Sequence, residues 1–424
     1  MSMTSTPRGM GIEHRIGEGI RQDLRQSVQA VGSIRIPEFL LFFLLVTHSV
    51  LPIPSIGFPI ANLLMVAAVG LALLRRPTHS LERVEWIIPV MVLGLFYVCA
   101  LSMFAEPTEF AADWQGRALR IAVTFVFALV IGSGRICLRS GLLGYTAALI
   151  LNVPLFLAGL LPAPYGQYLT GFIGDKNVAG MVYCIVGLLV LAVVQRRWPQ
   201  IALVVFFTSA LWLTGSRTSL AAFGAGLVWI LISPRLPVLG KWLLGAGIYF
   251  VVELLSEDYS RIGTFSDREG SDLLRSRIDA AAEIRVREAG FFGEGLGEAY
   301  VVFPDDPLKS WFFHNSYWSA LVEGGWPWLM VALLLTVLVA LRPFSQQLSR
   351  EEMITQAAGI ALLVCATRLG EVFFTISWAL VLGAAIRFGP QAGGGGTAPS
   401  GRKQNSLNRG RNRSAPEAAA ARWR

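Results

Sequence analysis

Long apolar segments recur along this chain, and short polar connections separate them. The longest can cross a hydrocarbon core of about 30 Å. Hydrophobic residues make up 54% of the 424 residues, charged residues only 15%, and the mean hydropathy is +0.56. A soluble chain of this length needs a more polar surface. Since the apolar runs are continuous rather than alternating, the sequence predicts an all-α polytopic membrane protein.

About twelve membrane-spanning helices are expected, and Lys and Arg gather in alternate connections between them. This charge pattern predicts that both termini are cytoplasmic. We see no cleavable signal peptide, and the four scattered cysteines show neither metal-ligand spacing nor a disulfide framework. The expected spans are Ile36–Val50, Ile56–Leu74, Glu85–Phe104, Ala118–Gly132, Leu142–Leu161, Val178–Val194, Ile201–Leu213, Thr218–Ile232, Trp242–Leu255, Ser316–Leu341, Met353–Leu369 and Phe373–Arg387.

The spans divide the chain into five parts. A basic cytoplasmic tail (1–35) precedes helices 1–9 (36–255), a periplasmic loop with short helices (256–313), helices 10–12 (314–390) and a disordered basic cytoplasmic tail (391–424). The loop is acidic, with 7 Lys/Arg against 12 Asp/Glu, although the chain has a net charge of +8. The basic excess therefore reflects membrane topology and does not indicate a nucleic-acid partner.

One segment of the loop has the pattern of an amphipathic helix. "SDLLRSRIDAAAEIRVREAG" is expected to begin at Ser271 and end at Gly290. Arg285 falls on its apolar face and Arg277 beside that face, and an arginine on a buried face needs an anionic partner. The following "FFGEGLGEAY" contains glycines that permit a tight turn, but its position does not fit a nucleotide-binding fingerprint.

His314 lies where the loop re-enters the membrane, between aromatic residues. A histidine there can be a general base near neutral pH. The structural alternative is an imidazole that caps the following helix together with Asn315 and Ser316. The residue pattern alone leaves both readings open.

Further polar residues lie on the same expected side. Arg217, in "WLTGSRTSLAAF", can form an anion cradle with nearby hydroxyls at a helix N-terminus, or extend to the interface as a structural arginine. In "GDKNVAG", Lys176 and Asn177 either contact a polar headgroup or belong to a loop with an Asn cap. Glu323, inside a span, needs a proton or a cationic partner.

Arg368 and Glu371 are three residues apart, which fits an intrahelical ion pair. Together, the arginines near His314 suit a lipid-linked diphosphate, because guanidinium groups match phosphate oxygens. No metal-ligand pattern or cofactor motif is present, so arginine is the expected stabiliser of the leaving group.

The stretch "FFHNSYWSALVEGGWPWLM" resembles the His-Asn motif of the O-antigen ligase and polymerase superfamily of membrane proteins. The motif is matched by His314, Asn315, Tyr317, Glu323 and Gly325. "TGSRTSLAA" and "GDKNVAG" resemble two further segments of the family. "RSRIDAAAEIRVREAGFFGEGLG" resembles its loop helix and turn, except that Gly290 replaces a proline and the helix has no tryptophan. The resemblance covers roughly residues 36 to 390.

This resemblance implies a metal-independent inverting glycosyltransferase that uses undecaprenyl-diphosphate-linked glycan at the periplasmic face of the bacterial inner membrane. His314 would be the general base. Arg217 and a loop arginine would hold the diphosphate; the family register favours Arg275, the helical wheel favours Arg277, and Arg285 ranks below both. The other substrate contacts that the resemblance implies are Lys176, Asn177, Asn315, Tyr317 and Glu323.

The implied role is in cell-surface polysaccharide biosynthesis, either as an O-antigen ligase or as a polymerase for O-antigen, capsule or exopolysaccharide. The acceptor would be a lipid A core or another lipid-linked chain, and a chain-length regulator is a possible partner. The sequence leaves the acceptor open. A transporter or flippase for lipid-linked saccharides is the alternative from another class, because twelve spans also suit transporters. A non-catalytic assembly partner is a third reading.

Overall fold

A computed structural model describes residues 34–47, 52–53, 58–258, 269–345 and 348–389. The structure is mostly helical, at 72%. All of the C-terminal tail, most of the N-terminal tail and residues 259–268 of the loop lie outside the described residues.

A helix occurs in the described part of the chain at each of the twelve predicted spans, and one more lies in the loop. Several begin with a side-chain cap that satisfies free backbone N–H groups, as at Asp113, Asp175, Asn315 and Thr375. The α-helices are α2 (Ile36–Leu44), α3 (Ile60–Leu73), α4 (Ile87–Phe104), α5 (Trp114–Gly132), α6 (Leu138–Leu157), α7 (Lys176–Val193), α8 (Arg197–Thr214), α9 (Arg217–Ile232), α10 (Val238–Asp258), α11 (Glu269–Glu288), α12 (Ser316–Leu334), α13 (Arg350–Ala366) and α14 (Ile376–Phe388).

The shorter elements are 3₁₀ turns, two pairs of strands and a π-helical extension of α12. They are η1 (Leu45–Thr47), β1 (Pro52–Ile53), β2 (Phe58–Pro59), η2 (Glu82–Val84), η3 (Gly171–Ile173), η4 (Ser233–Arg235), β3 (Tyr300–Phe303), β4 (Asp306–Phe312) and η6 (Leu335–Leu341). Both strand pairs are antiparallel.

Six helical segments within the described ranges are long and apolar enough to cross a membrane, which supports a membrane protein. They are Glu82–Phe104, Trp114–Gly132, Leu138–Leu157, Lys176–Val193, Arg217–Arg235 and Ser316–Leu341. Four shorter apolar helices accompany them. The larger number of twelve spans remains a prediction.

Helix α7 lies at the centre of the packing. It contacts α6, α8, α9, α13 and α14, and residues Ala179–Ala192 are all buried. Its small residues permit close approach: a Cβ on Gly180 would lie 2.6 Å from the Cβ of Ser216 in the segment before α9. A helix buried on every side has apolar residues around its whole circumference, and this one does. Helix α7 therefore connects two ends of the bundle through its interior.

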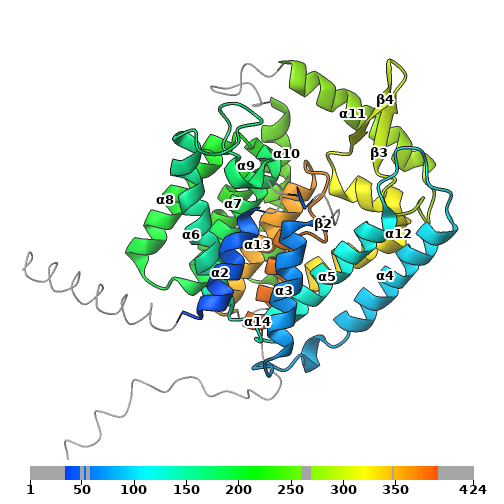
Figure 1. Ribbon diagram of the computed structural model, residues 1–424. Coiled ribbons are helices and arrows are strands. Elements are labelled where there is room, and N and C mark those ends of the chain that lie inside the picture. Colours follow the sequence, from blue (N-terminus) through cyan, green and yellow to red (C-terminus); the bar gives the residue numbers. More distant parts are fainter. Residues whose placement is uncertain (1–33, 48–51, 54–57, 259–268, 346–347, 390–424) are drawn as a thin grey trace, which may run out of the picture. The chain divides into compact units, whose positions relative to one another are not determined.

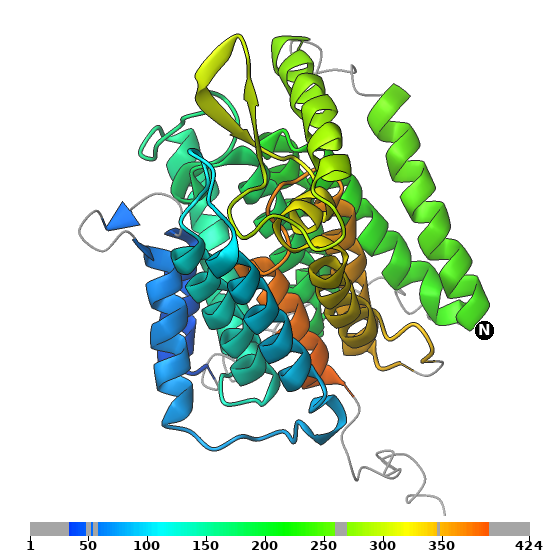
Figure 2. The ribbon, with the colours of Figure 1, turned by 90° about the vertical axis from the view of Figure 1, so that its right-hand side faces the viewer.

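The segment between α10 and α12 forms a small structure of its own against α12. Helix α11 and the β3–β4 hairpin lie together beyond the same ends of the helices (Figures 1 and 2). Ile278 and Ala282 of α11 are buried against Phe303 and Phe313, and Val322 of α12 completes this apolar cluster. The sequence predicted the helix here but not the hairpin.

Helix α12 is interrupted at Gly324 and Gly325, whose backbone angles are not helical. The turn 291–297 packs its backbone into this break: the backbone N–H of Trp326 donates to Phe291 O (2.9 Å), and that of Glu294 to Val322 O (2.7 Å). Gly325 has φ +64°, and a Cβ there would lie 2.0 Å from Phe291 O. A Cβ on Gly293 would likewise lie 2.5 Å from Gly325 N, so these two glycines are required by close backbone contact.

Candidate functional site

Several helix N-termini meet at one end of the bundle. Ser316, the first residue of α12, binds the loop after α13, because its hydroxyl donates to Leu369 O and accepts from Val372 N (3.0 Å). Asp175, the cap of α7, is close enough to His314 to affect its protonation. The N-termini of α7 and α9 are also adjacent, as the Gly180–Ser216 contact requires. Such an end favours anions, since helix N-termini carry partial positive charge.

His314 follows β4 and directly precedes the cap residue of α12. The helix is capped by Asn315, whose side-chain oxygen accepts from Tyr317 N (2.9 Å) and Trp318 N (3.3 Å). His314 is half-buried, and its buried Nδ1 atom has no hydrogen-bond partner within the described residues. The cap is thus supplied by Asn315 rather than by the imidazole, and the side chain of His314 is not used in this way.

Burial and, next, the positive charge of Arg275 lower the pKa of His314 from 6.5 to about 4, while Asp175 raises it. A neutral imidazole is therefore the form present at pH 7. Neutral imidazole carries a nitrogen lone pair that can accept a proton. The arrangement is compatible with a general base, and the adjacent arginine provides a fixed positive charge.

Arg275, Asp279 and Arg368 form a charged group beside His314. Burial raises the pKa of Asp279, and the charges of Arg275 and Arg368 act against this rise, so the three residues are close in space. A cavity of about 510 Å³ opens next to them. It is lined by Tyr249, Asp279, Asn315, Tyr317, Trp318, Thr367 and Arg368.

The three loop arginines proposed for a diphosphate face different surroundings. Arg277 pairs with the exposed Asp305 at 2.9 Å, and its guanidinium lies over the ring of Phe303. Arg285 pairs with Glu294 (2.5 Å), which supplies the anionic partner expected from its position. Arg275 is the one of the three with a close electrostatic interaction with His314.

Lys176 and Asn177 form the first turn of α7, and Arg217 begins α9. The expected Asn cap of α7 is wrong: the cap is Asp175, which accepts from Asn177 N (2.8 Å) and Val178 N (2.9 Å). Asp175 is the N-cap because its carboxylate precedes the free N–H groups of the first turn, whereas Asn177 is already inside the helix. Lys176 Nζ lies over two rings of the preceding loop, those of Tyr165 and Tyr168.

The serines expected to form an anion cradle with Arg217 are directed at each other. Ser216 Oγ donates to Ser219 Oγ at 2.8 Å, and both side chains are buried. The helix begins at Arg217, as the anion-cradle reading requires. The structure thus supports the helix N-terminus but assigns these two hydroxyls to local packing.

Glu323 has the cationic partner that its buried position demands. Arg117 of α5 places Nε 2.8 Å from Glu323 Oε1, and the same carboxylate oxygen accepts from Gly297 N at 3.1 Å. Arg117 also pairs with Glu371. Glu323 is therefore a link between α5, α12 and the glycine turn, held by contacts within the protein.

The predicted Arg368–Glu371 pair cannot be intrahelical, because α13 ends at Ala366 and both residues lie in the following loop. Tyr317 also has a packing contact, since its hydroxyl donates to Leu363 O of α13 at 2.9 Å.

The sequence did not point to Asp279, or to Arg368 as a neighbour of the site. Only the docking of α11 and the loop after α13 brings them beside His314. Among the described residues, no group of three His, Cys, Asp or Glu side chains could hold a metal ion.

In comparisons with known proteins, no family model and no curated protein matches this chain.

Proposed function

We propose that the protein is a multi-spanning glycosyltransferase of the O-antigen ligase or polymerase type. The observation that carries this proposal is His314: a neutral imidazole with a buried, unbonded Nδ1, close to Arg275. The next residue, Asn315, lines the cavity of about 510 Å³. Arg368 and the N-terminus of α9 at Arg217 add positive potential on the same side. This combination of a base and fixed cations suits the transfer of a glycan from a diphosphate.

In the proposed reaction, a hydroxyl of the acceptor glycan gives its proton to His314 as its oxygen attacks the anomeric carbon of the donor. The bond between that carbon and the diphosphate oxygen breaks with inversion, and the lipid diphosphate leaves with the electron pair. Arg275 and Arg217 would stabilise the negative charge that develops on it. His314 then releases the proton to solvent.

Substrate binding would also change the pKa of His314. Because the charge of Arg275 lowers the pKa of His314, a bound diphosphate that offsets this charge would raise that pKa. The imidazole would then be a stronger base when the donor is present. The donor would be an undecaprenyl-diphosphate-linked glycan at the periplasmic face of a bacterial inner membrane. The acceptor would be a lipid A core or a second lipid-linked chain.

The test uses a strain that lacks this protein but still makes the lipid-linked precursor of the surface glycan. It is complemented with the wild type, with His314→Ala, or with His79→Ala, which replaces the other histidine that the structure describes. Membrane abundance is matched by immunoblot, and extracted glycans are separated on a gel. We expect wild type and His79→Ala to restore long or attached glycan, and His314→Ala to fail. Equal restoration by all three would show that His314 is not the catalytic base.

A transporter for lipid-linked saccharides is favoured by one observation, the interrupted helix α12, because broken helices often form the substrate sites of transporters. However, the break is filled by the backbone of residues 291–297. A transporter would move the lipid-linked glycan without changing its length or linkage. Product analysis with purified protein and donor in vesicles therefore separates the two functions.

A further inference from the structure

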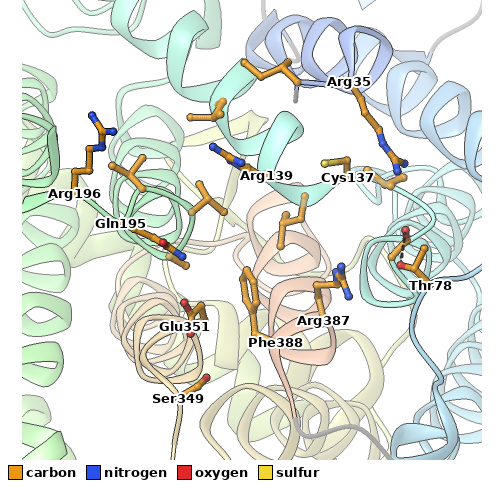
Figure 3. A pocket seen from close by; sticks show the side chains of 18 of the residues that line it. Arg35, Thr78, Cys137, Arg139, Gln195, Arg196, Ser349, Glu351, Arg387 and Phe388 are labelled. Atoms are coloured by element: carbon orange, nitrogen blue, oxygen red, sulfur yellow. Dashed lines mark hydrogen bonds between the residues drawn. The ribbon is translucent and has the colours of Figure 1, made fainter. Parts of the chain in front are cut away.

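A second large cavity lies at the opposite ends of the helices. Its volume is about 960 Å³. It is bordered by the N-terminal ends of α2, α6, α8 and α13 and by the C-terminal ends of α7 and α14. Figure 3 shows side chains from these separate elements arranged around one hollow.

This cavity is separate from the His314 site. Asp175 at the start of α7 is close enough to His314 to affect its pKa, whereas Val193 at the end of α7 lines the cavity. A straight helix of 18 residues spans about 27 Å, close to the thickness of a hydrocarbon core. Under the predicted topology, the cavity therefore opens to the cytoplasmic face.

The polar lining is strongly basic. Four arginines, one from each of four chain segments, line the cavity: Arg35, Arg139, Arg196 and Arg387 (Figure 3). Among its described lining residues, Glu351 is the one acidic side chain. Arg35 also pairs with the buried Glu38 at 3.8 Å. The three other guanidinium groups still outnumber the single carboxylate of the lining, which gives a positive potential that favours an anion.

Much of the remaining wall is apolar, although Thr78, Gln195 and Ser349 also line it. It includes Leu138, Leu143, Val193, Pro199 and Phe388. A small inorganic anion would leave this surface in contact with water, whereas an amphiphile would cover it. The chains of such a molecule could continue into the surrounding bilayer.

We propose that this cavity binds the phosphate of an anionic membrane lipid, with the headgroup among the arginines and the first part of the acyl chains against the apolar wall. Guanidinium groups donate paired hydrogen bonds to phosphate oxygens, which makes arginine well suited to this ligand. The N-termini of α6 and α8 have no side-chain cap, and they would add a favourable field to the arginines. The proposal does not depend on the glycosyltransferase function.

The test measures binding of short-chain phosphatidylglycerol to the purified full-length protein in detergent micelles, by native mass spectrometry and calorimetry. Short-chain phosphatidylcholine and inorganic phosphate are the comparison ligands. We expect phosphatidylglycerol to bind at least about tenfold more tightly than either. Arg139→Gln should weaken its binding about tenfold, and Arg139→Gln with Arg196→Gln about a hundredfold.

The matched control is Arg83→Gln with Arg235→Gln. It removes the same charge from the same expected membrane face, outside the cavity lining, and should change affinity by less than about twofold. Equal losses in the two double variants would reduce the effect to general surface charge and overturn the proposal. Equal binding of phosphatidylcholine, or the absence of any binding, would also overturn it. Inorganic phosphate binding as tightly as the lipid would contradict the lipid assignment. If the double cavity variant does not fold, the single Arg139→Gln variant decides the question.

Discussion

His314 combines two properties that oppose each other in a catalytic base. Its neutral form is available at pH 7, but a low pKa makes it a weak proton acceptor. This low pKa results first from burial of the imidazole and then from the positive charge of Arg275. The residue that would hold the leaving group thus also sets the basicity of the imidazole, which makes their coupling measurable.

Substitution of Arg275 should shift the acid limb of the pH–rate profile. Protonation of His314 would remove the base, so kcat/KM for the wild type should fall only as the pH approaches about 4. Arg275→Gln removes a positive charge that disfavours imidazolium, so the pKa rises and activity is lost at higher pH. The measurement is kcat/KM with a lipid-linked donor from pH 4 to 8. Arg277→Gln, at the exposed Asp305 pair, should leave the limb in place. An unchanged limb in Arg275→Gln would separate this arginine from His314.

Arg117 of α5 and Glu323 of α12 form a buried ion pair. Arg117→Met leaves the buried carboxylate of Glu323 without its cation, which should destabilise the protein by about 3–5 kcal/mol. Adding Glu323→Gln to this variant should recover most of the loss. Glu371 is largely exposed, so Glu371→Gln should cost less than about 1 kcal/mol. Thermal unfolding in detergent would report all three. Similar stability of Arg117→Met and wild type would show that the pair is not structurally important.

At this level the sequence identified single residues better than their partners. The position of His314 before an apolar run and the need of Glu323 for a cation were both evident. The identity of that cation was not, because Arg117 is more than 200 positions earlier in the chain. In the same way, Asp279 and Arg368 join His314 only through the packing of α11 and the loop after α13. Spacing along one chain does not encode such contacts.

The helices themselves were predictable, because each buries an apolar run and most boundaries follow a cap or a basic cluster. The β3–β4 hairpin was not. Its strand β4 is largely exposed and has no clear alternation, so pairing with β3 rather than its own pattern makes it a strand. The break in α12 also escaped the pattern, since one apolar run continues through both halves.

The break in α12 depends on close backbone contact between Gly325 and the turn 291–297. Gly325→Ala places a Cβ against Phe291 O at φ +64°, so the turn 291–297 should detach while the helices remain. We expect loss of glycan transfer and faster protease cleavage near the turn, with unchanged helical circular dichroism. Gly224→Ala is the matched control: it is helical with nothing within 4 Å of the added Cβ, and it should be neutral or slightly stabilising. Equal protease resistance of both variants would contradict the docking role.

Across the whole molecule, two polar regions occupy opposite helix ends. One contains His314 and the loop structure, and the other contains the basic cavity. If the twelve predicted spans are present, the first region faces the periplasm and the second the cytoplasm. Six helices in the described ranges already satisfy the length and hydropathy required. The remaining helices are shorter or more polar.

A labelling experiment tests this orientation. Leu308, in the hairpin, is 88% exposed, and Arg83 lies in the exposed connection before α4. In intact cells, Leu308→Cys should react with a membrane-impermeant maleimide, and Arg83→Cys should react only after permeabilisation. The native protein, which has four cysteines, is the control for background labelling. Reaction of both sites in intact cells would contradict the predicted topology.

The interruption at Gly324 separates eight residues, Ser316–Glu323, from the rest of α12. This short segment is anchored at both ends: Asn315 and Ser316 fix its start, and the Arg117 pair fixes Glu323. Eight helical residues measure about 12 Å. The segment therefore acts as a spacer of fixed length that sets how far His314 stands above the buried ion pair. One inserted or deleted residue would rotate one anchor by about 100° relative to the other, so substitutions should be tolerated within this segment more readily than any change in its length.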